Sequence, residues 1–558
     1  MKTIYAILQL TLFFPYCYIL AGNQVGKVDA VRAALYYSTN RTTASHDGTK
    51  SYSPLCRVTS ETDTTNVEPI SFSGKSFMWL VPTSEGWYLI SSTQKATPIL
   101  AHFRQAERPF FENFAPGAKE LLIAYEHYIA TITENNPSTL QHQEWRCILS
   151  EQNHIPTSTP RSISISPLLQ KDGREVSWAQ TGGYDCNKCY NKFCPSVTGT
   201  NADKQCYKAA AGCVAVAMAQ IMWYWEWPYA AYIPTISGGK VLDIQFYDWK
   251  QMPSKINLFT TNDEADQIAR LLRDCGYRAN MSYGIGSGTS PEWAEEAFQN
   301  MGYRNAQLKD KTYTSGWGNL IISELKAGRP VYYRGRTALL GGEGHAFVVN
   351  GYDATDSTFY INFGWNGQSN GYYHIDNIPT SYGSFNYHQE MIIGIQPTPN
   401  CSDKYYDQSN WSGSPKFFAI HNGSITLSGV EMSNIERGII YSGSQVTLKG
   451  GTKISLGSNV HIAIKQDIPC GSAQHSAEVA EHSISDDNEE TENTPRGMKK
   501  HIPVSDAVDH IAVYNISGQL LHTIYGVDTN LSSLPSGFYV LQKHMTDGSV
   551  VSETIVKN

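Results

Sequence analysis

Cys213 is the residue of this chain best suited to nucleophilic chemistry. It follows Gly212 and opens the alanine-rich segment 213–222, whose composition favours a helix. Backbone N–H groups at a helix start lack partners within the helix, and the positive end of the helix dipole favours a thiolate over a thiol. The alternative is that Cys213 is a small buried apolar residue. Its assignment therefore depends on partners elsewhere in the chain.

His345 and Asn362 are the first candidate partners. His345 follows a glycine-rich approach and precedes an apolar run that predicts a buried strand. Its imidazole can take the thiol proton and later return it to a leaving amine. Asn362 ends a second predicted strand, and its amide oxygen is expected to accept a hydrogen bond from the other ring nitrogen. Trp365 is expected to shield that bond from water.

Gln180 supplies a side-chain amide upstream of the cysteine, in the segment Trp178-Ala179-Gln180. Together with the backbone N–H of Cys213, this amide can hold the oxyanion of a tetrahedral intermediate. The four residues therefore predict thiol-dependent acyl transfer.

The order Gln, Cys, His, Asn resembles that of papain-like cysteine proteases, and the local motifs resemble the streptopain family. These motifs are Gly-Cys-Val-Ala, Ala-Gln-Ile-Met, Gly-His-Ala-Phe-Val, Asn-Phe-Gly-Trp and the segment 180–195. The resemblance covers roughly residues 25–396. It implies that Cys213 is the nucleophile, His345 the base, Asn362 the orienting amide and Gln180 the oxyanion donor. Phe363 departs from the pattern, because the type member has a tryptophan there.

The resemblance also suggests residues that contact the substrate. Segment 283–289 is similar to the family's substrate-lining loop, which would place Thr289 and Gly344 beside bound peptide. Trp365 is expected to contribute to the same cleft. A Gly/Ser loop of this kind is otherwise only a connection.

Composition limits the remaining possibilities. The chain has 558 residues, which suggests three or four domains, and a formal net charge of −8 that gives no basic field for nucleic acid. No cofactor or metal is expected. Cys186, Cys189, Cys194 and Cys206 allow either a zinc site or a local disulfide, and an exported chain favours the disulfide.

The predicted fold class is α+β. A papain-like two-lobed peptidase domain is preceded by a small α+β propeptide and followed by β-rich modules. The expected boundaries are 1–21 signal peptide, 22–162 inhibitory propeptide, 163–396 peptidase domain, 400–470 β-rich module, 471–505 acidic disordered linker and 506–558 C-terminal sorting domain. An unrelated N-terminal domain is the alternative for residues 22–162. The β-rich module is either a sandwich or a small β-solenoid, because its glycine-punctuated strands repeat.

The two ends of the chain suggest export. Lys2 precedes an apolar run that is too short to span a membrane and ends near small residues, as in a signal peptide. Segments 511–519 and 534–540 resemble the sorting domain of the type nine secretion system, with an ordinary small β-sandwich as the alternative. The resemblance implies a Gram-negative host, the type nine secretion machinery as partner, and a secreted or outer-membrane surface location without a transmembrane anchor in the mature protein.

The sequence thus predicts a secreted cysteine endopeptidase, made as a zymogen, that acts on protein or peptide substrates. The alternatives are another papain-like thiol hydrolase such as a cell-wall amidase, a transglutaminase, or an adhesin that keeps the fold only as a scaffold. The four intact residues Gln180, Cys213, His345 and Asn362 argue against the adhesin.

Overall fold

The computed structural model describes the chain in a series of segments. They are residues 24–44, 64–74, 76–105, 107–114, 116–134, 144–145, 148–149, 164–199, 206–336, 344–375, 387–399, 401–466 and 468, and strands 508–515, 520–525, 537–545 and 550–557. The predicted signal peptide, residues 150–163 and the predicted acidic linker 471–505 lie outside the described residues. The chain divides into two compact units, one ending at Gln396 and the other beginning at Pro397.

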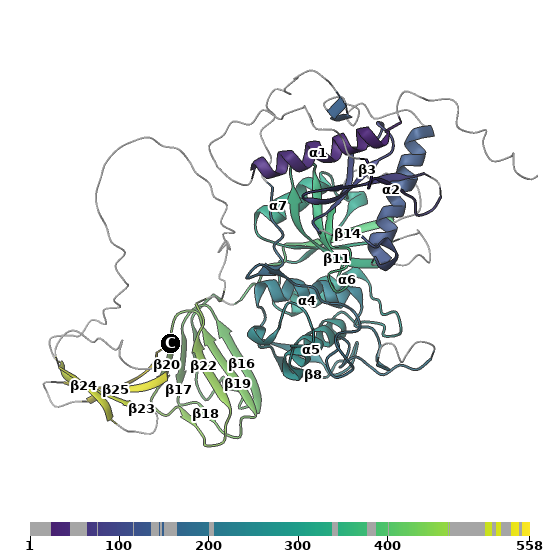
Figure 1. Cartoon of the computed structure of the whole chain (residues 1–558). Helices are drawn as coiled ribbons and strands as arrows, with labels where there is room; N and C mark the ends of the chain where they lie inside the picture. The colour runs from purple at the N-terminus through teal and green to yellow at the C-terminus, as the bar shows by residue number, and fades with distance from the viewer. Residues whose placement is uncertain are drawn as a thin grey trace, which may run out of the picture. The chain divides into compact units, whose positions relative to one another are not determined.

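A ten-stranded antiparallel sheet forms the centre of the first unit (Figure 1). Its strands, in spatial order, are β1 (Glu68–Ile70), β2 (Met78–Thr83), β3 (Gly86–Ser91), β4 (Ile99–Phe103), β13 (Gly371–Tyr373), β12 (Thr358–Asn362), β11 (Gly344–Asp353), β10 (Val331–Arg336), β14 (Tyr387–Ile393) and β9 (Gln307–Asp310). The pairing of β4 with β13 joins the N-terminal strands to those that carry His345 and Asn362.

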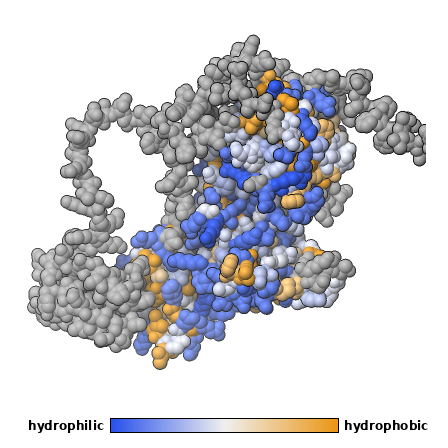
Figure 2. All heavy atoms as spheres, viewed as in Figure 1, coloured by the Kyte–Doolittle hydropathy of each residue, from blue (hydrophilic) through white to orange (hydrophobic). Residues whose placement is uncertain are grey.

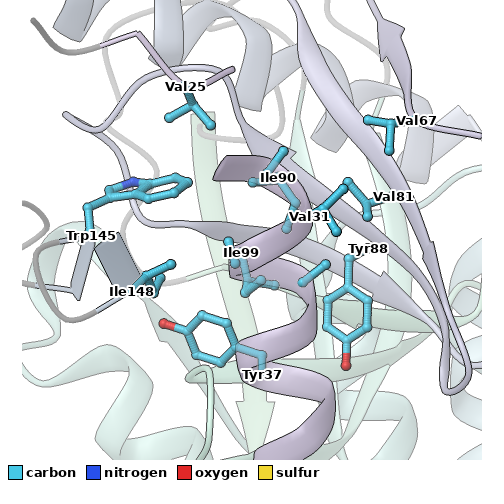
Figure 3. Packing of buried hydrophobic residues seen from close by; sticks show 13 residues of the cluster. Val25, Val31, Tyr37, Val67, Val81, Tyr88, Ile90, Ile99, Trp145 and Ile148 are labelled. Carbon is cyan, nitrogen blue, oxygen red and sulfur yellow. The ribbon is translucent and has the colours of Figure 1, made fainter. Parts of the chain in front are cut away.

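The N-terminal part of this unit has its own hydrophobic core. Helix α1 (Lys27–Ala44) packs on β2 and β3, and helix α2 (Pro116–Glu134) contacts β11, with the short 3-10 helix η1 (Phe111–Asn113) ahead of it. Figure 3 shows Val31 and Tyr37 of α1 facing Val81, Tyr88 and other apolar side chains of the strands. The predicted small α+β arrangement of this region is therefore present in its described residues.

Four further helices belong to the part of the unit that follows residue 164. They are α4 (Cys213–Trp225), α5 (Asn262–Arg278), α6 (Pro291–Asn300) and α7 (Trp317–Lys326). Helices α4 and α5 pack on each other, α4 also packs on β11, and α7 contacts β10 and β11. Figure 1 shows α4 near the middle of the unit, with α5 and the hairpin strand β8 farther from α1.

Smaller elements connect these helices. They are the hairpin strands β5 (Gln170–Lys171) and β6 (Arg174–Glu175), the pair β7 (Ala230–Pro234) and β8 (Leu242–Phe246), and the 3-10 helices η3 (Trp249–Gln251) and η4 (Lys311–Tyr313). Helix α5 begins with a full capping box, in which Thr261 and Glu264 satisfy each other's backbone N–H groups. The described helices and strands thus form a mixed α and β unit.

The second unit begins with a parallel β-solenoid. Strands β15 (Lys404–Tyr406), β17 (Ile425–Ser428) and β20 (Val446–Lys449) form one sheet, β16 (Lys416–His421), β19 (Arg437–Ser442) and β22 (Val460–Ile464) a second, and β18 (Glu431–Met432) and β21 (Lys453–Ile454) a third. Every pair is parallel, and successive coils stack in register, so that the apolar residues of the strands fill the interior. Of the two architectures predicted for residues 400–470, the solenoid is confirmed.

The end of the chain forms a separate antiparallel sheet. Its strands are β23 (Val508–Asn515), β24 (Leu520–Tyr525), β25 (Gly537–Met545) and β26 (Val550–Lys557), in the order β24-β23-β25-β26. The backbone pairing fits a small β unit, as the sequence predicts for residues 506–558.

The described surface is mainly polar. Figure 2 shows hydrophilic residues over most of the visible described surface, with hydrophobic residues in limited patches. Among the described helices, none combines the length and the apolar character needed to cross a bilayer.

Candidate active site

Cys213 is the first residue of α4, as its sequence context predicts. Gly212 precedes it with a φ of 89°, and a Cβ at this glycine would lie 2.8 Å from the Met281 side chain. The backbone angle therefore favours glycine, and a larger residue would also displace the end of the Met281 side chain. The segment before the helix is held by hydrogen bonds from Ala211 N to Gln180 O (2.8 Å) and from Ala210 N to Gly284 O (3.0 Å).

His345 lies at the start of β11 and reaches the cysteine. Its side chain is buried and forms a hydrogen bond with the Cys213 side chain. Its Nε2 lies 3.0 Å from the carbonyl oxygen of Phe363. Because a carbonyl can only accept, Nε2 carries the hydrogen in this contact, and Nδ1 is the nitrogen left for the thiol. The rings of Phe347 and Phe363 lie beside the imidazole.

The surroundings of Cys213 favour its thiolate. Burial by itself raises the pKa of the thiol, but the hydrogen bond and charge of His345 act in the opposite direction. The Ala346 backbone N–H and the Arg334 guanidinium lower it further, and the net pKa of Cys213 is below its ordinary value. The thiol of Cys275, by contrast, is fully buried inside the fold, and burial raises its pKa well above the ordinary value. The two cysteines therefore differ in the property that nucleophilic attack needs.

Asn362 lies close to this pair but does not make the contact expected of it. Its Oδ1 accepts hydrogen bonds from Gln220 Nε2 (3.2 Å) and Gly364 N (3.0 Å), and its Nδ2 donates to Val176 O (2.7 Å) and Glu175 Oε1 (3.2 Å). The partner of the His345 ring is instead the carbonyl of the next residue. The register of the sheet accounts for the difference, because Asn362 is opposite Val348 rather than His345.

Gln180 is tied to the active-site segments through its backbone. Its carbonyl accepts from Ala211 N, two residues before the nucleophile. The neighbouring residue Ala179 forms a bridge with Trp365, and Trp178 O accepts from Asn366 N (3.1 Å). The structure thus brings the 178–180 segment alongside both the cysteine segment and the loop after Asn362.

The three residues predicted to contact substrate have different environments. Thr289 uses its hydroxyl to donate to Ala279 O (2.6 Å), which holds its own loop. Gly344 is exposed at the first position of β11, and Trp365 is partly buried. Their contacts with substrate, and the shielding role of Trp365, remain predictions. The glycines at 341 and 342 lie outside the described residues.

The cysteines ahead of the nucleophile do not form a metal site in the described residues. Cys186 and Cys206 form a disulfide, while Cys189 and Cys194 are buried thiols. Burial raises the pKa of Cys194 to about 12, so that thiol stays protonated. The local disulfide favoured by the sequence is confirmed. Within the described part of the chain, no group of three or more His, Cys, Asp or Glu side chains has the arrangement of a metal site.

Two functional features had no signal in the sequence. The Phe363 carbonyl holds His345, but every residue carries a carbonyl, so no residue type marks the position. Glu175, a partly buried carboxylate that accepts from Asn362, stands in an unremarkable polar hairpin. Its proximity to Asn362 follows only from the folded structure.

Comparison with known proteins shows which family the middle of the chain resembles. Residues 184–373 match the peptidase C10 family model. The thiol protease/hemagglutinin PrtT of Porphyromonas gingivalis is 33% identical over 262 residues, which cover 42% of this chain and 28% of that protein. Streptopain of Streptococcus pyogenes is 26% identical over 352 residues, covering 58% of this chain and 81% of that protein. The chain therefore matches well under half of the length of PrtT.

Two solved structures are also similar to parts of the chain. A fragment of prointerpain A from Prevotella intermedia has a TM-score of 0.44 at 22% identity, over 60% of this chain and 99% of that one. Active interpain A from the same organism has a TM-score of 0.33 at 26% identity, over 42% of this chain and 95% of that one. Residues 184–373 thus match a cysteine peptidase family model, and the two relatives named above are a thiol protease/hemagglutinin and streptopain.

Proposed function

We propose that this protein is a secreted cysteine endopeptidase, made as a zymogen, in which Cys213 and His345 form the catalytic pair. The observation that carries the proposal is the hydrogen bond between these two side chains at the start of α4, together with the lowered pKa of the thiol. A thiolate beside an imidazole is the arrangement that nucleophilic cysteine catalysis requires.

The proposed reaction has two stages. The Cys213 thiolate attacks the peptide carbonyl, and the imidazolium of His345 gives its Nδ1 proton to the leaving amine as the C–N bond breaks. His345 then takes a proton from water, whose oxygen attacks the thioester, and the C–S bond breaks to return the thiolate and release the carboxylic acid. Acid–base catalysis of this kind contributes roughly 10²–10⁴-fold to the rate.

Gln180 and the Cys213 backbone N–H are the proposed oxyanion donors. The hydrogen bond from Ala211 N to Gln180 O supports this role, because it fixes the two segments next to each other. Removing one donor of an oxyanion hole typically lowers kcat about 10²–10³-fold. Asn362 keeps an orienting role in this proposal, but it acts through the backbone rather than by touching the imidazole.

The segment 22–162 is the proposed inhibitory propeptide. Two contacts support an intimate association with the enzyme domain: β4 pairs with β13, and Tyr125 Oη donates to His374 O (2.7 Å). The cleft between two lobes, which the propeptide would obstruct, is part of the same proposal. Addition of the separately produced segment to processed enzyme should inhibit it.

Export through the type nine system is the proposed role of residues 506–558. The described strands of this region contain a small antiparallel sheet, and the catalytic pair lies in the other unit of the chain. Cells that express a truncated form without residues 506–558 should accumulate active protease in the periplasm. Normal appearance at the surface or in the medium would contradict this role.

The test of the catalytic assignment compares two cysteine variants. Cys213→Ala should have no detectable peptidase activity and should accumulate as precursor, whereas Cys275→Ala should remain active because that thiol lies inside the fold against Met222. New amino termini should be measured alongside incorporation of a labelled amine. Cleavage at the wild-type rate by Cys213→Ala would contradict the proposal, and amine incorporation without cleavage would indicate a transglutaminase.

A further inference from the structure

A network of polar side chains lies directly behind the contact between His345 and Phe363. Its centre is Glu175, the last residue of β6. This carboxylate accepts hydrogen bonds from Tyr360 Oη (2.8 Å), Asn362 Nδ2 (3.2 Å) and Asn370 Nδ2 (2.9 Å). All three donors are side chains from the β12 strand or the loop that follows it.

The network fixes the amide orientation of Asn362. Its Nδ2 has two acceptors, Glu175 Oε1 and Val176 O, so its Oδ1 must face the opposite side. There it accepts from Gly364 N and from Gln220 Nε2 of α4. The carboxylate and the Val176 carbonyl together therefore decide which way the amide points.

The same amide fixes the carbonyl that holds His345. The Gly364 N–H and the Phe363 C=O belong to one planar peptide unit, in which they point in opposite directions. Because Asn362 Oδ1 accepts from the N–H at 3.0 Å, the C=O is directed away from the network, and it meets His345 Nε2 at 3.0 Å. Turning the amide would release the peptide plane and, with it, the imidazole.

Two further contacts restrict this peptide. Asn370 Oδ1 accepts from Phe363 N (3.1 Å), so the second amide bound to Glu175 holds the preceding backbone N–H. On the other side, Gly364 has a φ of +66°, and a Cβ there would lie 2.8 Å from Val216 Cγ1 of α4. The peptide is thus enclosed between the network and the helix that carries the nucleophile.

We propose that Glu175 is a positioning residue that orients His345 toward Cys213 through Asn362 and the Phe363–Gly364 peptide. The inference rests on the proposed cysteine peptidase function. Glu175 itself lies outside the matched family segment 184–373, and it touches neither the thiol nor the imidazole by any recorded hydrogen bond. Its effect is geometric.

The charge state of Glu175 bears on the same geometry. Burial raises its pKa to about 7, although the bonds from Tyr360, Asn370 and Asn362 oppose the shift. The phenol of Tyr360 stays neutral because burial raises its pKa well above 10, with Arg104, the residue after β4, acting in the other direction. The asparagines, and Gln220 of α4, carry no charge. Protonation of Glu175 below neutral pH would replace one acceptor oxygen by an O–H group. The hydrogen bonds from the Asn362 and Asn370 amides to this side chain would then weaken.

The experiment compares Glu175→Leu, Glu175→Gln and the control Glu226→Gln, each expressed as the full-length protein and assayed after processing by added wild-type enzyme. Glutamine keeps an acceptor for the two asparagine amides, whereas leucine keeps none. Glu226 pairs with Lys171 of the neighbouring strand β5 at 2.7 Å and does not contact the network, so its variant should behave as the wild type. Peptide hydrolysis and the rate of Cys213 alkylation by iodoacetamide, read by peptide mass mapping, are measured between pH 5 and 9.

Glu175→Leu should lower kcat about 10–100-fold with little change in KM, because a displaced base slows the chemistry rather than the binding. Its Cys213 should be alkylated more slowly at neutral pH. Glu175→Gln should recover most of the activity and lack the loss of activity that the wild type shows as the pH falls through about 7.

Each outcome separates this inference from the proposed function. If wild-type activity depends on Cys213 but Glu175→Leu retains its kcat and alkylation profile, the positioning role is wrong and the protease assignment stands. If the processed wild type hydrolyses no peptide, the protease assignment fails, and the alkylation profile still decides the geometry of the pair. Should Glu175→Leu fail to fold, Glu175→Gln decides the question. If its activity falls at low pH in the same way as that of the wild type, the inference is overturned.

Discussion

Two buried or partly buried carboxylates of the first unit show how the kind of hydrogen-bond donor influences the pKa of an acidic side chain. Glu126, on α2 in the N-terminal part, is fully buried and accepts from the Ser71 hydroxyl and from the backbone N–H groups of Phe72, Ser73 and Ser76. Burial alone would raise its pKa, but these four bonds lower it to about 2.

The pKa of Glu175 is shifted the other way, to about 7, and burial is the largest cause. Its donors are side chains, and one of them, Asn362 Nδ2, also serves Val176 O. Backbone N–H groups in a fixed loop cannot turn away from the carboxylate, whereas shared side-chain amides compensate less of the lost hydration. The comparison separates a carboxylate that anchors a loop from one that stays sensitive to pH near the active site.

The largest expected effect is on the anchoring carboxylate. Glu126→Ala leaves a hydroxyl and three backbone N–H groups without their acceptor, which should lower the free energy of unfolding by about 3 kcal/mol or more. Urea unfolding of the full-length protein measures it. Glu112→Ala, at an exposed position of η1, should stay within about 0.5 kcal/mol of the wild type. Equal stability of the two variants would contradict the anchoring role.

The second prediction concerns pH. The folded-state pKa of Glu126, about 2, lies below its ordinary value of 4.5, so its stabilisation is present above about pH 4.5 and is lost toward pH 2. The folded-state pKa of Glu175, about 7, lies above 4.5, so its contribution is greatest below pH 4.5 and is lost as the pH rises through 7. Glu175→Gln should therefore flatten the decline in stability between pH 4.5 and 7, by on the order of 1–3 kcal/mol. Thermal unfolding across this range is the measurement, and an unchanged decline would show that Glu175 does not cause it.

The smallest expected effect comes from removing one donor at each site. Tyr360→Phe deletes the O–H that donates to Glu175 Oε2 and should raise the pKa of Glu175 further, moving the acid limb of activity to higher pH. Ser71→Ala deletes one of four donors to Glu126 and should leave that carboxylate ionised. Each should cost about 1 kcal/mol of stability. A shift of the acid limb in Ser71→Ala, but not in Tyr360→Phe, would reverse the assignment of roles.

The sequence predicted the helix and strand that carry the site residues better than it predicted the hydrogen-bond partners of those residues. A glycine before an alanine-rich helix marked Cys213, and a buried strand marked His345, because helix and strand patterns are local properties. The repeated β-branched segments likewise marked short strands, without deciding between a sandwich and a solenoid. The acceptor for His345 could not be predicted, since it is a main-chain atom whose position depends on the pairing of β11 with β12. Glu175 was missed for a related reason: its hairpin reaches Asn362 only in the folded chain.

Strand β4 is the element through which the N-terminal part adds to the sheet, opposite Tyr372 and Tyr373 of β13. On the propeptide role proposed above, cleavage near residue 163 followed by dissociation would turn β13 from an interior strand into an edge, with unpaired main-chain donors and acceptors. Such an edge can pair with any extended chain of suitable register. The processed enzyme would thus have an edge where the released segment can rebind in trans or where two enzyme molecules can associate. Its association would then depend on protein concentration, unlike the intramolecular pairing in the intact chain.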